Sequence, residues 1–326
     1  MEQVRAFLIA ATRVAALGLA IGLAGLALLA QGGRFSDRLD ALTHFTPLFL
    51  AGLLTAALLW LAAGRNGRAT PLLALIGVLS TLTLMAPEMA AMTRSRPTAG
   101  ADPAATLKVV QFNLWGRNRD PLATARWILD TDPDLVVVEE GMGEARGVLT
   151  ALADRYPYRT TCDQPHACST QILSKTRPTA RGGLYTDRLA GAWATFPGPG
   201  EPYTVVGVHY TWPYPAGPQQ QMTRRLSLVL DQFPRDRLIL TGDFNSTPWS
   251  FSLRRQDRLF GLERRTRGLA SWPAGQVSRL NLAAPFPLFP IDHVYAGAGW
   301  RTVEVRRGPR LGSDHYPVVV TLAARP

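Results

Sequence analysis

Two kinds of hydrophobic pattern divide the chain. The first hundred residues contain three long runs of apolar and small residues: Val14–Ala30, Phe45–Ala63 and Pro71–Ala86, the last continuing to Met92. A membrane-spanning helix needs about 20 predominantly apolar residues, so the first two runs qualify and the third is marginal. Beyond residue 106 the apolar runs are short and are separated by Pro/Gly turns, which is typical of a folded domain.

Strand-like and helix-like patterns alternate through this second part. The expected strands are 107–113, 134–140, 170–175, 190–196, 203–210, 237–245, 291–297, 300–308 and 316–323. The expected helices are 121–130, 145–156, 219–233 and 251–262. Mixed strands with helices between them predict a layered α/β domain with a large core. We therefore expect a membrane segment of about three helices at 1–92, a Pro/Ala/Gly/Thr-rich linker at 93–106 and a catalytic domain at 107–324.

The arginines beside the apolar runs predict an orientation. Arg5 and Arg13 precede the first run, and Arg65 and Arg68 lie in the short loop between the second and third. The positive-inside rule places both regions in the cytoplasm. Three spans would then put everything after Met92 on the far side. The expected location is the inner (cytoplasmic) membrane, multi-pass, with the catalytic domain on the periplasmic or extracellular side.

Two observations weigh against this topology. A cleaved signal peptide is the alternative for Met1–Ala30, although two further apolar runs close behind disfavour it. Arg94 and Arg96 lie just beyond the third run, on the side that the topology places outside.

The chain has two cysteines, Cys162 and Cys168, six positions apart. A close pair in an exported domain favours a disulfide that closes a small loop. Two free thiols are the alternative. A metal site of both cysteines with His166 is weaker still, because structural zinc usually has four protein ligands and no fourth is evident.

The charge of the chain favours an anionic partner. The net charge is +11, and the first hundred residues, with eight arginines and four acids, supply +4 of it. The remaining +7 suits nucleic acid, phospholipid headgroups or small phosphates without choosing among them. The arginine-rich stretch 254–267 is most simply the solvated face of a helix, and a phosphate-binding face is the alternative.

Polar side chains recur where the expected strands end or begin. They are Asn113, Glu139 with Glu140, His209, Asp243 with Asn245, Asp292 with His293, and Asp314 with His315. Each alone reads as an ordinary turn or cap residue. Together they predict one pocket, because strand ends on one side of a layered sheet converge. Clustered carboxylates need a cation, and an oxygen-rich ligand set is what Mg²⁺ or Mn²⁺ prefers.

A known family shares this ordered set of motifs. The motifs are "QFNLWG", "PDLVVVEE", "VGVHY", "LTGDFNSTP", "PIDHVY" and "GSDHYPVVV". Together they resemble the endonuclease/exonuclease/phosphatase superfamily, whose members are DNase I-like, and the preceding apolar runs resemble those of its bacterial membrane-tethered members. The resemblance covers roughly residues 107–322. It implies a four-layered α/β sandwich, in which two packed mixed β-sheets are flanked by helices, preceded by the transmembrane segment.

The resemblance also implies a metal site. Glu140, rather than Glu139, matches the metal-binding glutamate of the family. Asn113 matches the asparagine beside the metal, and Asp314 resembles a second carboxylate on the metal side. The implied cofactor is Mg²⁺ or Mn²⁺.

Five further residues match catalytic positions. Asp243 and Asn245 match the pair that orients the attacking water and holds phosphate. His315 resembles the histidine that contacts the scissile phosphate. His209 matches the DNase I-like histidine, and Asp292 the aspartate that fixes its tautomer. Either histidine could serve as the acid to the leaving oxygen.

The expected function is a membrane-anchored, metal-dependent phosphoesterase that hydrolyses a phosphodiester or phosphomonoester by in-line attack of an activated water. A nuclease-like activity is favoured. A lipid or inositol-phosphate phosphoesterase is the alternative, for which the aromatic, proline-rich segments 211–218 and 285–290 would form an apolar rim unless they are structural loops. An inactive binding scaffold is less favoured, because no key group is missing. The expected partners are a phosphate-ester substrate and the membrane, and no obligate protein partner is indicated.

Overall fold

The described residues form two compact units. The computed structural model describes residues 1–94, 106–162, 169–186, 189–198, 201–214, 216–277 and 282–325. Unit 1 contains Met1–Ala91, with the short later segments Tyr214–Ala216 and Thr247–Arg254, and unit 2 contains the rest of the described chain. The expected linker lies almost entirely outside the described residues. Unlike the single boundary expected from the sequence, the division assigns two downstream segments to the helical unit.

Unit 1 is helical, and its helices differ in length from the apolar runs. They are α1 (Glu2–Gln31), the 3-10 turn η1 (Gly32–Arg34), α2 (Asp37–Thr43), α3 (Thr46–Ala62) and α4 (Ala69–Arg94). Two stretches, Glu2–Arg34 and Ala69–Thr93, are long and apolar enough to cross a membrane, so the structure indicates membrane association.

The second apolar run is less suited to span a membrane than expected, and the third is better suited. The second run forms α3, which has 17 residues and meets the length of a span only together with α2, bent 58° from it. The third run was expected to be marginal, yet α4 continues through Pro87 to Arg94 over 26 residues. The sequence pattern did not locate the helix break before Thr46. It did indicate that the third run continues to Met92 across Pro87, but it underestimated that run as a span.

A buried aspartate anchors the downstream segment within unit 1. Asp40, 3 % exposed, accepts hydrogen bonds from the backbone N–H groups of Phe251 and Ser252 at 2.8 and 2.7 Å. His44 Nδ1 lies 3.0 Å from Thr247 Oγ1. These contacts explain why the segment that follows the GDFN motif belongs to the helical unit.

Unit 2 is built on two six-stranded mixed sheets. The first has the strand order β13-β14-β1-β2-β4-β3 and the second β5-β6-β7-β8-β12-β9. The strands of the first are β1 (Thr106–Asn113), β2 (Leu135–Glu139), β3 (Tyr158–Thr161), β4 (Gln171–Ser174), β13 (Trp300–Arg307) and β14 (Val318–Ala324). Those of the second are β5 (Ala180–Thr186), β6 (Leu189–Phe196), β7 (Tyr203–His209), β8 (Leu238–Asp243), β9 (Glu263–Arg264) and β12 (Asp292–Ala296). A separate hairpin pairs β10 (Gly275–Val277) with β11 (Leu282–Ala284).

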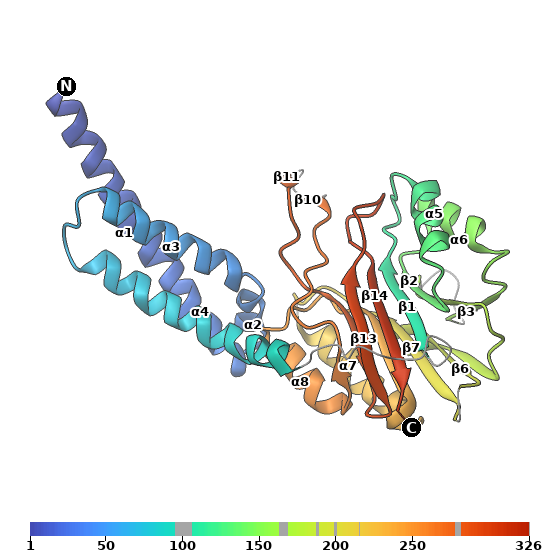
Figure 1. Cartoon of the computed structure of the whole chain (residues 1–326). Coiled ribbons are helices and arrows are strands. Elements are labelled where there is room, and N and C mark those ends of the chain that lie inside the picture. The colour runs from blue at the N-terminus through green and yellow to red at the C-terminus, as the bar shows by residue number, and fades with distance from the viewer. Residues whose placement is uncertain are drawn as a thin grey trace. The chain divides into compact units, whose positions relative to one another are not determined.

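The sheets pack face to face with helices outside them, as Figure 1 shows for β1, β13 and β14 against β6 and β7. Helices α5 (Pro121–Thr131) and α6 (Arg146–Leu152) cover the outer face of the first sheet, where they enclose a second apolar cluster. Helix α7 (Ala216–Leu230) buries Met222, Leu226 and Leu230, and α8 (Phe251–Phe260) follows the GDFN motif. Unit 2 is therefore the four-layered DNase I-like sandwich expected from the resemblance, and the apolar helices of unit 1 precede it in the sequence.

The expected elements are present with shifted ends, and several short strands are additional. The helix expected at 145–156 is the shorter α6, and the one expected at 219–233 begins earlier as α7. Strands β3, β5, β9, β10 and β11 are additional, because short or partly exposed strands carry little hydrophobic periodicity.

The arginine-rich stretch 254–267 is not simply a solvated helix face. Helix α8 ends at Phe260, and Arg264 and Arg265 are 1 % and 6 % exposed. Arg264 forms an ion pair with Asp257 and Arg265 forms one with Glu263. Burial of an arginine requires such pairing. This part of the stretch is therefore structural.

The cysteine pair falls partly outside the described residues. Cys162 is 2 % exposed, and no described cysteine is a free thiol. Cys168 lies outside the described residues. The Cys162–Cys168 disulfide therefore stays a prediction.

Candidate active site

The inner faces of the two sheets change from apolar to polar toward one end of the sandwich. Along β1, Val109 belongs to the core between the sheets, and Gln111 and Asn113 follow it at two-residue intervals on the same face. The other strands repeat this step, from Val137 to Glu139, from Val205 to His209, from Ile239 to Asp243 and from Val294 back to Asp292.

Strand register then brings the polar ends together. Asn113 pairs with Glu139 across the parallel β1–β2 ladder, and His209 pairs with Asp243 across the parallel β7–β8 ladder. Asp292 pairs with Asp243 across the antiparallel β8–β12 ladder. The convergence expected from the sequence is therefore present on both sheets.

Asp243 lies at the centre of the site. Its side chain is almost fully buried, and Asn245 N–H donates to its Oδ1 at 2.8 Å. The amide group of Asn113 donates to Oδ2 at 3.1 Å. His209 Nε2 and His315 Nε2 lie 3.6 and 3.7 Å from the same Oδ2. Burial raises the pKa of Asp243 to about 6, although both histidines counteract the shift.

The His315 imidazole is buried and contacts the Asp292 carboxylate. Its Nδ1 lies 2.8 Å from Asp292 Oδ2, and both side chains are nearly fully buried. Burial lowers the pKa of His315, but the Asp292 and Asp243 carboxylates outweigh it and raise the value to about 10. Burial likewise opposes ionisation of Asp292, yet the nearby His315 holds the pKa of Asp292 below its usual value. The pair is therefore an imidazolium–carboxylate pair near neutral pH.

This contact corrects one role implied by the resemblance. Asp292 was expected to fix the tautomer of His209, but its Oδ2 contacts His315 and its Oδ1 accepts from the amide of Gln111 at 2.8 Å. His209 faces Asp243 instead. The expected role was wrong because β12, which carries Asp292, pairs with β8. It is not a neighbour of β7, which carries His209.

Gln111 was not recognised from the sequence as a site residue. It is fully buried, and its amide nitrogen donates to both Glu139 and Asp292 at 2.8 Å. Burial is the main reason that the pKa of Glu139 lies well above its usual value, which favours its neutral form. The available signal was spacing: Gln111 precedes Asn113 by two positions on the same strand face.

Three site residues adopt left-handed backbone conformations that non-glycine residues rarely use. The φ angles are 54° at Trp115, 52° at Glu140 and 47° at Asn245. Such conformations cost free energy and persist where surrounding structure over-determines them, often at functional sites. Glu140 thereby leaves the direction of β2, which separates its half-buried side chain from the buried Glu139.

The Glu140 carboxylate is suited to bind a divalent cation. Its carboxylate accepts N–H bonds from Asn113 at 3.2 Å and Gly116 at 3.3 Å, and no described ion pair includes it. A half-buried carboxylate with weak donors and no cationic partner leaves its charge available to a metal.

Three other ligand groups lie close together. Ligand atoms of Asp243, Asp292 and His315 lie within 4.8 Å of one another. However, both Asp292 oxygens already accept hydrogen bonds and His315 is protonated there, which makes this trio a poorer cation cage. Glu140 is the better candidate for the metal ligand.

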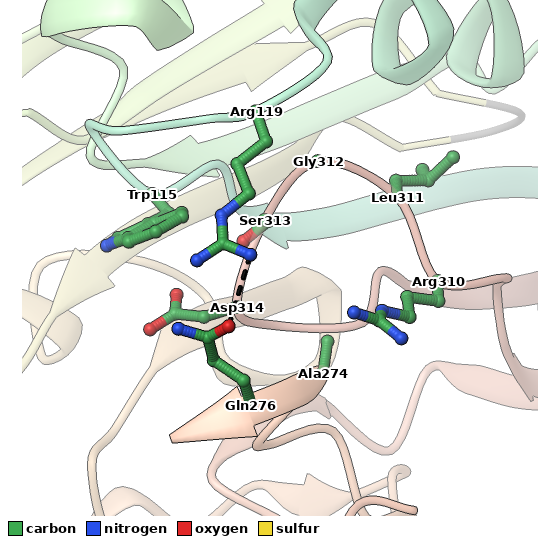
Figure 2. Close-up of a pocket in the computed structure, with 9 residues that line it drawn as sticks. All are labelled: Trp115, Arg119, Ala274, Gln276, Arg310, Leu311, Gly312, Ser313 and Asp314. Atoms are coloured by element: carbon green, nitrogen blue, oxygen red, sulfur yellow. Dashed lines mark hydrogen bonds between the residues drawn. The ribbon is translucent and has the colours of Figure 1, made fainter. Parts of the chain in front are cut away.

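The loop before β14 supplies the last site residues. Ser313 Oγ donates to the Asn113 carbonyl at 2.7 Å, and His315 N–H donates to Ser313 Oγ at 3.0 Å. Asp314 lies between them and lines a pocket next to the site (Figure 2). His293, by contrast, contacts the Ser246 carbonyl at 2.9 Å and is a structural residue.

Comparison with protein families identifies this set of motifs. The model of the Endonuclease/Exonuclease/phosphatase family matches residues 110–315. That range contains every site residue described above. No curated protein sequence matches this chain significantly.

Solved structures of several different proteins share this fold. Sphingomyelinase C from Streptomyces griseocarneus is 20% identical, with 68% of this chain and 99% of that chain covered and a TM-score of 0.50. A beta toxin variant from Staphylococcus aureus with bound magnesium ions is 14% identical, with coverages of 67% and 99% and a TM-score of 0.52. TDP2 from D. rerio, complexed with a single-strand DNA product, is 16% identical, with coverages of 68% and 100% and a TM-score of 0.54. At sequence identities of 14–20%, these structural similarities establish a shared fold and nothing more.

Proposed function

Because the chain belongs to the endonuclease/exonuclease/phosphatase family, whose members are metal-dependent phosphoester hydrolases, we propose that it hydrolyses a phosphate ester by in-line attack of a water molecule that Asp243 activates. One observation carries this proposal: Asp243 Oδ2 lies within 3.7 Å of two histidines and accepts a hydrogen bond from the Asn113 amide. A phosphate and its attacking water would meet an acceptor, two imidazoles and an amide at one point.

Asp243 is the proposed general base. Its pKa of about 6 leaves it ionised yet basic near neutral pH, where a general base is most effective. Asn245 holds Oδ1 through its backbone N–H, and its side chain donates to the Tyr210 carbonyl at 2.9 Å. Asn245 therefore fixes the direction of Oδ2, the oxygen that would take the proton.

The two histidines have different proposed roles. His315, kept cationic by Asp292, donates a charge-assisted hydrogen bond to the phosphate as negative charge develops. His209 has a side chain 24 % exposed, and its carboxylate neighbour is Asp243. It can exchange protons with solvent and is the better candidate for the acid that protonates the leaving oxygen.

Glu140, Asn113 and Asp314 are the proposed metal-binding residues, with Mg²⁺ or Mn²⁺ as the cation. When bound there, the cation supplies Lewis-acid polarisation of a phosphoryl oxygen. Glu140 contributes a carboxylate that has no cationic partner in the described chain. Asn113 connects the two halves of the site, because its amide nitrogen donates to both Glu140 and Asp243.

We place the enzyme at the inner membrane, with unit 2 on the periplasmic or extracellular side. The two long apolar helices support the membrane location. The arginines at the N-terminus and at 65 and 68 support the orientation, and the periplasmic side further requires the bent pair α2–α3 to be the third span. A nuclease-like phosphodiesterase is the favoured activity. A lipid phosphoesterase is the second candidate, because Trp212, exposed in segment 211–218, and Phe286, exposed in segment 285–290, would suit a bilayer-facing rim.

A substrate panel tests the proposal. The purified full-length protein in detergent, with Mg²⁺ or Mn²⁺, is assayed on supercoiled DNA, abasic DNA, RNA, sphingomyelin and inositol phosphates. Hydrolysis of at least one of these, lost in Asp243→Asn, is the expected result. Hydrolysis of sphingomyelin alone would favour the lipid enzyme. No hydrolysis of any of them by a folded, metal-loaded protein would contradict the proposed function.

A further inference from the structure

A pocket beside the proposed catalytic centre contains two arginines that have no carboxylate partner among the described residues. Its lining includes Trp115, Arg119, Gln276, Arg310, Ser313 and Asp314. Figure 2 shows the guanidinium groups of Arg119 and Arg310 directed into it from two different walls. No ion pair within the described ranges includes either arginine.

Arg119 is held in place by uncharged contacts, and Arg310 packs against a glycine. Arg119 Nη1 donates to Gln276 Oε1 at 3.2 Å, and its guanidinium lies 5.4 Å from the centre of the Trp115 ring. Arg310 lies against Gly275, where the Cβ atom of any other residue would collide with its Cζ. The φ of 82° at Gly275 is one that glycine adopts readily, and the contact places the flexible end of Arg310 beside this backbone. Positioned arginines lose less freedom on binding an anion than mobile ones.

Hydrogen bonds connect this pocket to the catalytic centre. Trp115 N–H donates to Asn113 Oδ1 at 3.0 Å, and Ser313 Oγ donates to the Asn113 carbonyl. Asp314 precedes His315 directly. The pocket therefore adjoins the candidate site through Trp115, Ser313 and Asp314.

We propose that the Arg119–Arg310 pocket binds a second phosphate of the substrate, adjacent to the phosphate that is hydrolysed. The inference rests on the proposed function and narrows its substrate class to compounds with at least two phosphates. The pocket is partly open, and its 250 Å³ of space between the lining atoms includes open solvent, so an anion bound there would keep part of its hydration and its linking group could leave toward the solvent. A phosphocholine headgroup, with one phosphate and a cationic end, suits two arginines poorly. The next phosphate of a nucleic acid strand and another phosphate of a cyclitol share the required chemistry.

Matched substrate pairs test the proposal. The full-length protein is assayed on thymidine dinucleotides with and without a terminal 5′- or 3′-phosphate, and on inositol bisphosphates against monophosphates. Charge-assisted hydrogen bonds predict a ratio of kcat/KM between the two-phosphate and one-phosphate members of about tenfold or more in the wild type. Arg119→Gln and Arg310→Gln should each reduce that ratio severalfold. The pair that shows the ratio identifies the source of the second phosphate.

Arg117→Gln is the matched control. Arg117 is an exposed arginine two positions from Arg119 and does not line the pocket, so its replacement changes the net charge equally. It should leave the ratio unchanged. A wild-type ratio near one for every pair, or a ratio that persists in both pocket variants, would overturn the proposal.

A binding measurement separates failure of this inference from failure of the proposed function. Inorganic pyrophosphate is titrated calorimetrically into the protein in the presence of chelator and low salt, where no turnover is required. Wild type and Arg117→Gln should bind it equally, and Arg119→Gln and Arg310→Gln at least about tenfold more weakly. If no substrate is hydrolysed but this pattern holds, the pocket assignment stands and the catalytic one fails. Equal binding by all four proteins, or no binding by wild type, overturns the pocket.

Discussion

The Asp292 carboxylate and the His315 imidazole are in direct contact at 2.8 Å, buried between the two sheets, while His209 faces Asp243. The order of strands produces this pairing. β12 and β8 are neighbours, and the loop before β14 brings His315 over from the other sheet. The catalytic centre is therefore assembled from both sheets.

The Asp292–His315 pair predicts a pattern of non-additivity. His315→Ala should lower kcat by about 10²- to 10⁴-fold, because it removes a cationic donor to the developing charge. Asp292→Asn should add little to His315→Ala, since the two act as one unit, but should multiply the loss caused by His209→Ala. Turnover and melting temperature are measured on the same preparations. Coupling of Asp292 to His209 instead of His315 would contradict the observed pairing.

Asp243→Asn should abolish most turnover without unfolding the protein. The change removes the proposed base but retains the volume and one hydrogen-bond acceptor, so kcat should fall by about 10²-fold or more. Substrate binding should change less, because proton transfer occurs in the transition state. A Michaelis–Menten analysis with a parallel melting curve distinguishes this from a structural cap. A folded variant with near-wild-type kcat would show that the base is elsewhere.

Removal of the metal should stop the reaction, and Glu140 should set the metal requirement. Excess chelator is expected to abolish hydrolysis, and Mg²⁺ or Mn²⁺ to restore it. Glu140→Gln should raise the Mg²⁺ concentration needed for half-maximal activity by about tenfold or more, because it removes a ligand charge. The neighbouring change Glu139→Gln is the control and should leave that concentration nearly unchanged, since Glu139 is fully buried against Gln111 and its raised pKa favours the neutral form. Full activity in chelator, or restoration by zinc alone, would contradict the metal assignment.

Asp257 should stabilise unit 2 in a pH-dependent way. Its carboxylate accepts from Arg264 at 3.0 Å and from Tyr295 Oη at 2.7 Å. Burial opposes ionisation, but Arg264 outweighs it and holds the pKa of Asp257 below its usual value. Breaking such a pair costs about 3–5 kcal/mol, so Asp257→Asn should lower the melting temperature at pH 7 by about 6–12 °C.

The pH profile of that difference follows from the sign of the pKa shift. Because the folded-state pKa is depressed, the stabilisation is complete above the unfolded-state pKa of about 3.9 and is lost as pH falls through the folded-state pKa. The difference between wild type and Asp257→Asn should therefore be constant from pH 7 to about pH 5 and shrink below about pH 4. Asp231→Asn, which breaks an exposed pair with Arg235, is the control and should change the melting temperature by about 2 °C or less. A difference that stays constant to pH 3 would contradict the ionic origin.

Cys162 and Cys168 should be oxidised to one another. Alkylation of the native protein, isolated without reductant and analysed by mass spectrometry, should label neither thiol, and reduction should expose both. Quantitative labelling of both before reduction would contradict the disulfide and weaken the proposed export of unit 2.

The sequence by itself determined the layered fold and most of the candidate site. Alternation with a two-residue period placed Asn113, His209 and Asp243 on the same faces as apolar core residues, so their convergence could be predicted without coordinates. Ordered motifs identified the family, and long uncharged runs identified the helical unit. These features are local, because each depends on neighbours within a few residues.

Only the tertiary structure decided which groups are partners. The Asp292–His315 contact spans 23 positions and depends on strand order, and the Gln111–Asp292 bond spans 181. The inclusion of 247–254 in the helical unit depends on Asp40, more than 200 positions earlier. The raised pKa values of Glu139 and Asp243 both depend on burial, which no local pattern reports. Side-chain pairing and desolvation are determined by distant segments, and for that reason they appear only once the two sheets are packed.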